Sequence, residues 1–157
     1  MPVITLADPS SAEALAIIRS YYDDIVTRYH GRPVTEAELD EILLDEPSDD
    51  LQGETGAFLV AFEIDDAVGC CGIRYIDADT AELTRVFVAP QARGRGLARL
   101  FIDELESIAR GTGRTVIRLD VRSDLVEARG LYARLGFREV PAFNDSPYAG
   151  YWMAKNL

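Results

Sequence analysis

The stretch best suited to chemistry is TRVFVAPQARGRGLAR, which spans residues 84–99. A run of β-branched and aromatic residues ends at Pro90, two glycines then alternate with arginines, and a sequence with helical spacing follows. This order predicts a strand, then a turn with two glycines, then the start of a helix. Such an arrangement places several N–H groups at a helix N-terminus, which carries about half a positive charge. Glycine lets the backbone of such a turn approach a ligand closely. The stretch therefore predicts a phosphate-binding loop.

This loop differs from two well-known phosphate-binding loops. The P-loop requires a Lys-Ser/Thr pair after its second glycine, and this chain has none there. The dinucleotide fingerprint requires a third glycine where Arg99 stands, and a parallel βαβ unit before it. The pattern that fits is Q-x-x-G-x-G, which begins at Gln91 and directly follows a strand ending in V-x-P.

The elements that must position this loop alternate between strand and helix spacing. Three apolar runs joined by short Asp-rich turns predict antiparallel neighbours, and a nearly continuous apolar run predicts one buried strand. Strands are expected at residues 2–8, 57–64, 67–76, 81–88 and 115–121, with two more in the tail around a loop at 144–147. Helices are expected near residues 12–30, 36–44, 97–110 and 127–135. The order β-α-α-β-β-β-α-β-α-β-β predicts an α+β fold with helices on both faces of one sheet.

Capping residues mark the ends of these helices. Thr35 and Glu38 form a capping-box pattern. Gly31 is placed to stop the first helix, and Gly136 to cap the last, with Phe137 packing back.

Length and composition are those of one globular domain over residues 1–157, because no repeat or linker divides the chain. No apolar run approaches the roughly 20 residues of a membrane span, and no signal peptide is visible. Cys70 and Cys71 are neighbours on a strand and point to opposite faces, so neither a disulfide nor a shared metal site is expected. We expect a reduced, cytoplasmic protein without a metal.

Charge is unevenly spread along the chain. The net charge of -11 disfavours partners such as nucleic acid or an anionic membrane. Residues 35–54 hold nine acids and no Lys or Arg, whereas residues 85–138 hold eleven arginines against six acids. One interpretation is solvated helix faces. The other is a site with one end for a polyanion and another for a cation.

Two blocks of sequence resemble the GNAT superfamily of acetyltransferases. They are ELTRVFVAPQARGRGLARLFIDELE, residues 82–106, and LYARLGF, residues 131–137, and the order of elements agrees over nearly the whole chain. The ending PAFNDSPYAGYWMAKNL is similar to that of small bacterial members. The resemblance implies a mostly antiparallel, splayed sheet of about seven strands, acetyl-CoA as co-substrate, and N-acetyl transfer to an amine by direct attack.

The resemblance also implies a cofactor site. The strand at 82–88 would splay from the strand at 115–121, so that the backbone of Val86 and Val88 bonds the pantetheine arm. Amides of residues 93–98 would take the diphosphate, with an arginine near the 3′-phosphate. The cofactor-binding candidates are Val86, Phe87, Val88, Gln91, Arg93, Gly94, Arg95, Gly96, Leu97, Ala98, Arg99 and Tyr132. Ordinary sheet core for residues 86–88 and solvent exposure for the arginines are the alternatives.

Three catalytic candidates follow from the same resemblance. Tyr132 matches the tyrosine that protonates the CoA sulfur, and the Val88 N–H is the oxyanion donor. Glu82 matches a carboxylate that deprotonates the amine through water, with Asp120 as the second candidate. A core tyrosine and an exposed strand-end glutamate are the structural alternatives. A Cys-His nucleophile using Cys70 or Cys71, with His30 as the one histidine, is a further alternative, although no G-x-S-x-G elbow is present.

The sequence departs from the family pattern at one contact. Many relatives carry an asparagine that bonds the pantetheine three residues before Ala128, where this chain has Leu125. The neighbouring Asp124 is only an acceptor when ionised. That contact to the cofactor is therefore in doubt.

The acceptor site is expected between the first two helices and the late loop. Its candidates are Tyr29, Glu82, Asp120, Asn144 and Tyr148, with the acidic run at 36–50 attracting a cationic amine. We expect a small amine or amino-acid derivative as acceptor, in preference to the alternatives of a protein N-terminus or a lysine, and a homodimer as one assembly. A non-catalytic acyl-CoA-binding or sensing module on the same fold is the alternative. A protein for another phosphate ligand is a third hypothesis.

Overall fold

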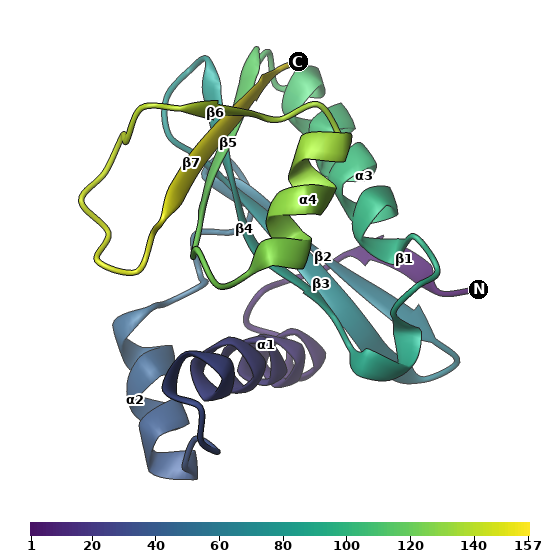
Figure 1. Ribbon diagram of the computed structural model, residues 1–157. Coiled ribbons are helices and arrows are strands. Elements are labelled where there is room, and N and C mark those ends of the chain that lie inside the picture. Colours follow the sequence, from purple (N-terminus) through teal and green to yellow (C-terminus); the bar gives the residue numbers. More distant parts are fainter.

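Seven strands form one sheet in the order β1-β2-β3-β4-β5-β7-β6. The computed structural model describes residues 1–157 (Figure 1). All neighbouring strands are antiparallel except β4 and β5, which are parallel. The strands are β1 Val3–Leu6, β2 Gly56–Glu63, β3 Asp66–Tyr75, β4 Thr80–Val88, β5 Val116–Val121, β6 Arg138–Val140 and β7 Tyr151–Asn156.

Four α-helices cover the two faces of this sheet, as the sequence predicts. They are α1 Ala12–His30, α2 Glu36–Asp45, α3 Leu97–Gly111 and α4 Val126–Arg134, and a short 3-10 turn, η1 Pro90–Ala92, follows β4. Figure 1 shows α3 and α4 on one side of the sheet and α1 and α2 on the other. None of these helices combines the length and hydropathy that a membrane-spanning helix requires.

Two apolar clusters hold the helices on the sheet. On one face, Phe101, Ile102 and Leu105 of α3 are fully buried against Leu83 of β4 and Ile117 of β5. On the other face, Ile17 and Ile18 of α1 pack with Phe58, Val60 and Phe87. The predicted α+β fold with helices on both faces is confirmed.

The parallel pair β4–β5 is short. Only Thr80–Glu82 pairs with Val116–Arg118, whereas β4 continues beside β3 to Val88 and β5 continues beside β7 to Val121. Six residues of β4, 83–88, therefore have no partner on the β5 side. The predicted splay of these two strands is present.

A β-bulge in β4 lies where the two strands separate. Thr84 pairs with Gly72 and Phe87 with Cys70, so two residues, Arg85 and Val86, stand opposite one. Arg85 has a φ of 55°, which is rare for a bulky side chain. The extra residue reverses the alternation: Leu83 packs on the α3 side, but Phe87 packs on the α1 side. The sequence analysis did not predict this bulge.

Candidate functional site

The loop between β4 and α3 presents a row of unpaired backbone N–H groups. Gly94 and Gly96 both have a φ of 77° and nothing within 4 Å of an added Cβ, so both need glycine and both face open space. The nearest amides in backbone hydrogen bonds are those of Arg93, to Pro90, and Leu100, to Gly96. The six amides from 94 to 99 donate no hydrogen bond within the protein, and the last three start α3. This arrangement suits an anion with several oxygens.

The three arginines of the loop are half-exposed and lie near carboxylates. Arg95 pairs with Glu63 at 2.6 Å, Arg99 lies 3.9 Å from Asp103 one turn along α3, and Arg93 lies 3.7 Å from Asp24 of α1. Exposed pairs of this kind are weak and exchange readily. The arginines are thus neither buried nor firmly held, and they surround the row of free amides.

The edge of β4 beyond the bulge is open for backbone hydrogen bonds. Ala89 donates to Val68 of β3, so the alternation of an antiparallel ladder bonds Phe87 to Cys70 and turns the amide and carbonyl of Val88 away from β3. The same alternation places Val86 on the side of Val88. The Val88 carbonyl accepts from Arg93 Nε at 2.8 Å, a bond that must break before a ligand can use that oxygen.

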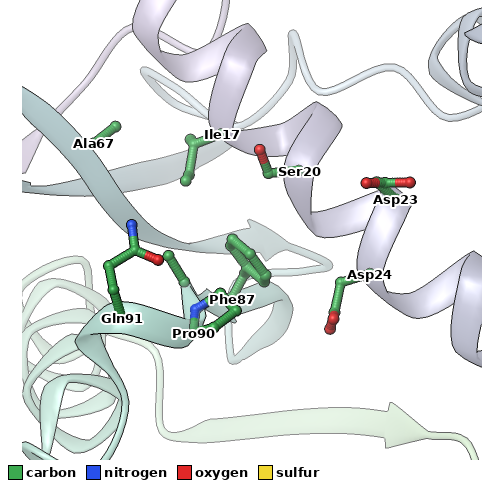
Figure 2. A pocket seen from close by; sticks show the side chains of 9 residues that line it. Ile17, Ser20, Asp23, Asp24, Ala67, Phe87, Pro90 and Gln91 are labelled. Atoms are coloured by element: carbon green, nitrogen blue, oxygen red, sulfur yellow. The ribbon is translucent and has the colours of Figure 1, made fainter.

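A cavity of about 330 Å³ lies beside this loop, between α1 and the end of β4 (Figure 2). Phe87 and Gln91, two predicted cofactor residues, line it opposite Ser20, Asp23 and Asp24 of α1. Neither Tyr132 nor Glu82 lines it. The cavity thus lies at the end of β4, and none of the free amides of residues 94–99 lines it.

Tyr132 is the buried residue of α4, with 7% of its surface exposed. Its ring packs edge-to-face on Phe137 at 5.8 Å, in the cluster that also holds Leu97. The hydroxyl makes no hydrogen bond within the protein, and it is not among the sealed unpartnered polar atoms, so it reaches the protein surface. Burial raises the pKa of Tyr132 well above its usual 10.0, so the phenol is protonated at neutral pH.

The two predicted carboxylates have different partners. Glu82 faces Arg118 across the last paired position of β4 and β5, and its Oε2 accepts from Arg118 Nε at 2.9 Å. Asp120, two residues further along β5, accepts from the Asn144 side-chain amide at 2.8 Å and has no cationic partner within 4.0 Å. Asp120 is thus the free negative charge of the pair, and Glu82 is neutralised by its neighbour.

Apart from Glu82, the predicted acceptor residues form two contacts, each made by one residue of the loop that joins β6 to β7. Asn144 Oδ1 accepts from Trp152 Nε1 at 3.0 Å, which fixes the amide that reaches Asp120. Tyr148 packs edge-on against Tyr29 of α1 at 5.4 Å, and Arg122 lies over the Tyr29 ring. The structure therefore brings Asp120 together with Asn144, and Tyr29 together with Tyr148.

The alternative of a Cys-His nucleophile does not fit this geometry. Cys70 and Cys71 are completely buried, and burial raises the pKa of both thiols, which keeps them protonated. Cys70 Sγ donates to the Arg85 carbonyl, and His30 packs beside Tyr29 at the exposed end of α1. No three of the His, Cys, Asp and Glu side chains gather as a metal site would require.

Two features of the acceptor side escaped the sequence analysis. Four of the eight acids in residues 36–50 pair within the protein: Arg19 pairs with Glu36 and Asp40, Arg32 with Glu38, and Arg74 with Asp50. The other four, Glu41, Asp45, Glu46 and Asp49, form no salt bridge, so only part of the run stays available to a cationic amine. In addition, Arg85 is buried on the face of the sheet that α1 covers, and the bulge turns it there; its trace in the sequence is the pair of adjacent polar residues Thr84 and Arg85.

Comparison with solved structures finds the same fold along the whole chain. A proposed acyl-CoA N-acyltransferase from Klebsiella pneumoniae is 28% identical, with a TM-score of 0.75 and coverage of 100% of this chain and 98% of that chain. The PaiA N-acetyltransferase of Thermoplasma acidophilum, solved in complex with coenzyme A, is 20% identical, with a TM-score of 0.75 and 99% coverage of both chains. A GNAT family acetyltransferase from Elizabethkingia anophelis, solved with acetyl-CoA bound, is 13% identical, with a TM-score of 0.67 and coverage of 99% and 98%.

Comparison with family models agrees with the fold and the loop. The model of the acetyltransferase (GNAT) family matches residues 18–137, which include β4, the row of free amides, and Tyr132 on α4. The chain therefore belongs to the GNAT family of acetyltransferases.

Proposed function

We propose that this protein is an N-acetyltransferase that moves the acetyl group of acetyl-CoA to a primary amine by direct attack. The observation that carries the proposal is the run of six consecutive free amides, 94–99, directly beside the unpaired edge of β4. A diphosphate offers oxygens to such amides, and an extended arm adds to such an edge as a strand would. The Thermoplasma and Elizabethkingia structures, solved with coenzyme A and acetyl-CoA, support this choice of ligand.

Backbone groups and side chains would bind different parts of acetyl-CoA. Backbone amides of residues 94–99 would hold the diphosphate, with Arg93, Arg95 and Arg99 available to the 3′-phosphate once they leave their weak pairs. The backbone of Val86 and Val88 would bond the pantetheine arm. Val86 and Val88 side chains meanwhile pack on the α3 side, so packing and binding do not compete.

Acetyl transfer needs one proton removed and one supplied. The amine nitrogen forms a bond to the acetyl carbon, and the carbon–sulfur bond breaks. The Val88 N–H would stabilise the carbonyl oxygen, and the Tyr132 phenol, which burial keeps protonated, would give its proton to the leaving sulfur. Asp120 would take the proton of the amine through water.

We expect Asp120→Asn to lower kcat by about 10²–10³-fold, and Glu82→Gln to lower it by less than about tenfold. Glu82 already pairs with Arg118, whereas Asp120 has only a neutral amide as its partner. The measurement is kcat with acetyl-CoA at saturation, for both variants and the wild type. Because both substitutions are nearly isosteric, they are matched controls for one another. A larger loss for Glu82→Gln would return the base role to that residue.

The direct test of the proposed function is release of CoA thiol from acetyl-CoA in the presence of a panel of primary amines. Calorimetry with CoA, dephospho-CoA and ATP tests the ligand separately. We expect CoA to bind best, and at least one amine to raise thiol release above the rate in water. A clear preference for ATP would exclude the proposal. Tight CoA binding with no turnover of any amine would instead favour a non-catalytic acyl-CoA-binding module.

A further inference from the structure

Arg85 is a buried cation without an anionic partner. Its side chain is 4% exposed, and no carboxylate lies within 4.0 Å of it. Its terminal nitrogens donate to Thr84 Oγ1 at 3.0 Å and to the carbonyls of Glu46 and Pro47 at 3.2 and 3.3 Å. Its Nε is the one buried side-chain N or O in the chain that has no hydrogen-bond partner. Buried charges are normally paired, and an uncompensated one is destabilising.

Arg85 lies next to the separation between β4 and β5, on the face of the sheet where the acceptor is expected. It sits in the bulge, three residues beyond the last β4–β5 pair, and its guanidinium lies 5.7 Å from the Tyr22 ring of α1. Asp120 stands two residues beyond that same pair, on the other strand. Ile117, Leu119 and Val121 of β5 pack on the α3 side, so Asp120 faces the side of α1 and α2, as Arg85 does. Where the two strands diverge, β4 thus carries the positive charge of Arg85 and β5 the negative charge of Asp120.

We infer that the acceptor carries a carboxylate as well as the amine, and that Arg85 Nε receives this carboxylate. The inference rests on the proposed function, because it assigns the acceptor of that same site. Nε is the guanidinium nitrogen nearest the strand; it has no hydrogen-bond partner and is covered by neighbouring side chains, so the carboxylate reaches it once those side chains move aside. An amino acid or a similar small zwitterion would place its carboxylate on Arg85 and its amine toward Asp120. The acids of residues 36–50 that pair with Arg19, Arg32 and Arg74 do not compete for this cation.

A purely structural role for Arg85 makes a different prediction. Its bonds to the Glu46 and Pro47 carbonyls hold the C-terminal end of α2, where a cation is favourable. That role requires only the terminal nitrogens and does not involve Nε. If it were the whole role, loss of Arg85 would lower stability and weaken all acceptors equally. A carboxylate receptor instead distinguishes acceptors that differ only in that group.

The experiment compares free amino acids with their primary amides as acceptors. Thiol release from acetyl-CoA is measured for the wild type, Arg85→Gln, Arg85→Lys and the control Arg19→Gln, which loosens the other end of α2 through Glu36 and Asp40. We expect wild type and control to favour one or more free acids over their amides by about ten- to hundredfold in kcat/KM. Arg85→Gln should bring this ratio close to one. Comparing ratios between variants cancels the different basicities of the two amines.

Each outcome separates this inference from the proposed function. Equal use of acids and amides by the wild type, or use of uncharged amines alone, would overturn the inference and leave the acetyltransferase standing. An unchanged ratio in Arg85→Gln would also overturn it. If Arg85→Gln does not fold, Arg85→Lys and the acid–amide ratio of the wild type decide the question. Failure of the wild type to bind CoA in calorimetry would contradict the proposed function itself.

Discussion

Replacing Tyr132 by phenylalanine should lower kcat by about 10²–10⁴-fold, the usual contribution of a positioned general acid. Affinity for CoA should stay unchanged, because the ring that packs on Phe137 is retained. Folding stability should change by no more than about 0.5 kcal/mol, since the hydroxyl has no partner in the protein to lose. The measurements are kcat with acetyl-CoA and the best amine, CoA affinity by calorimetry, and thermal unfolding.

The pH dependence gives a second readout of the same role. Because burial raises the pKa of Tyr132 above 10.0, the acid form persists through neutral and mildly alkaline pH. The wild type should therefore show no fall in kcat from loss of the phenol proton below about pH 10. Tyr75→Phe is the matched control, since Tyr75 lies at the end of β3 under Arg114 and outside the site. An unchanged kcat in Tyr132→Phe would remove the acid role and leave Tyr132 as a core residue.

Much of the fold follows from local patterns in the sequence. The capping box of Thr35 and Glu38 forms both of its hydrogen bonds, and α2 begins where it predicts. Gly31 ends α1 with a φ of 69°, and Gly136 follows α4 with a φ of 96°. These signals act over a few residues, so they are legible without tertiary information. The free amides of the loop belong to the same class, because two glycines before a helix fix them locally.

The missed features depend on contacts between distant elements. The bulge at Arg85 arises in the pairing of β4 with β3, and its trace in the sequence is limited to two adjacent polar residues, Thr84 and Arg85, before an apolar run. The pairing of Glu82 with Arg118 depends on the parallel register of β4 and β5, and the acids of α2 find their arginines only after α1 and α2 pack together. Counts of charged residues along the chain could not distinguish the carboxylates that pair with arginines from those that do not. The proposed choice of Asp120 over Glu82 as base, and of Arg85 as the acceptor charge, therefore rests on these long-range contacts and not on the sequence.

The second large effect is expected at the loop itself: Gly96→Ala should weaken acetyl-CoA binding by about ten- to hundredfold. A Cβ at Gly96 meets no protein atom, so the variant should fold, with a cost of about 1–2 kcal/mol for the left-handed φ of 77°. In the proposed complex, the added methyl group would stand beside the free amides that the phosphate oxygens approach. Loss of one hydrogen bond to a charged group corresponds to about that change in affinity. Calorimetry with CoA measures it.

Gly113→Ala provides the control that separates strain from ligand contact. Gly113 lies at the opposite end of α3, has a φ of 87°, and also has nothing within 4 Å of an added Cβ. The two variants should thus lose similar stability in thermal unfolding, since the backbone penalty is the same. Only Gly96→Ala should lose CoA affinity, because only there do unpaired amides surround the substituted position. Equal affinities in the two variants would mean that the diphosphate does not bind at this loop, and the placement of acetyl-CoA along β4 would fail with it.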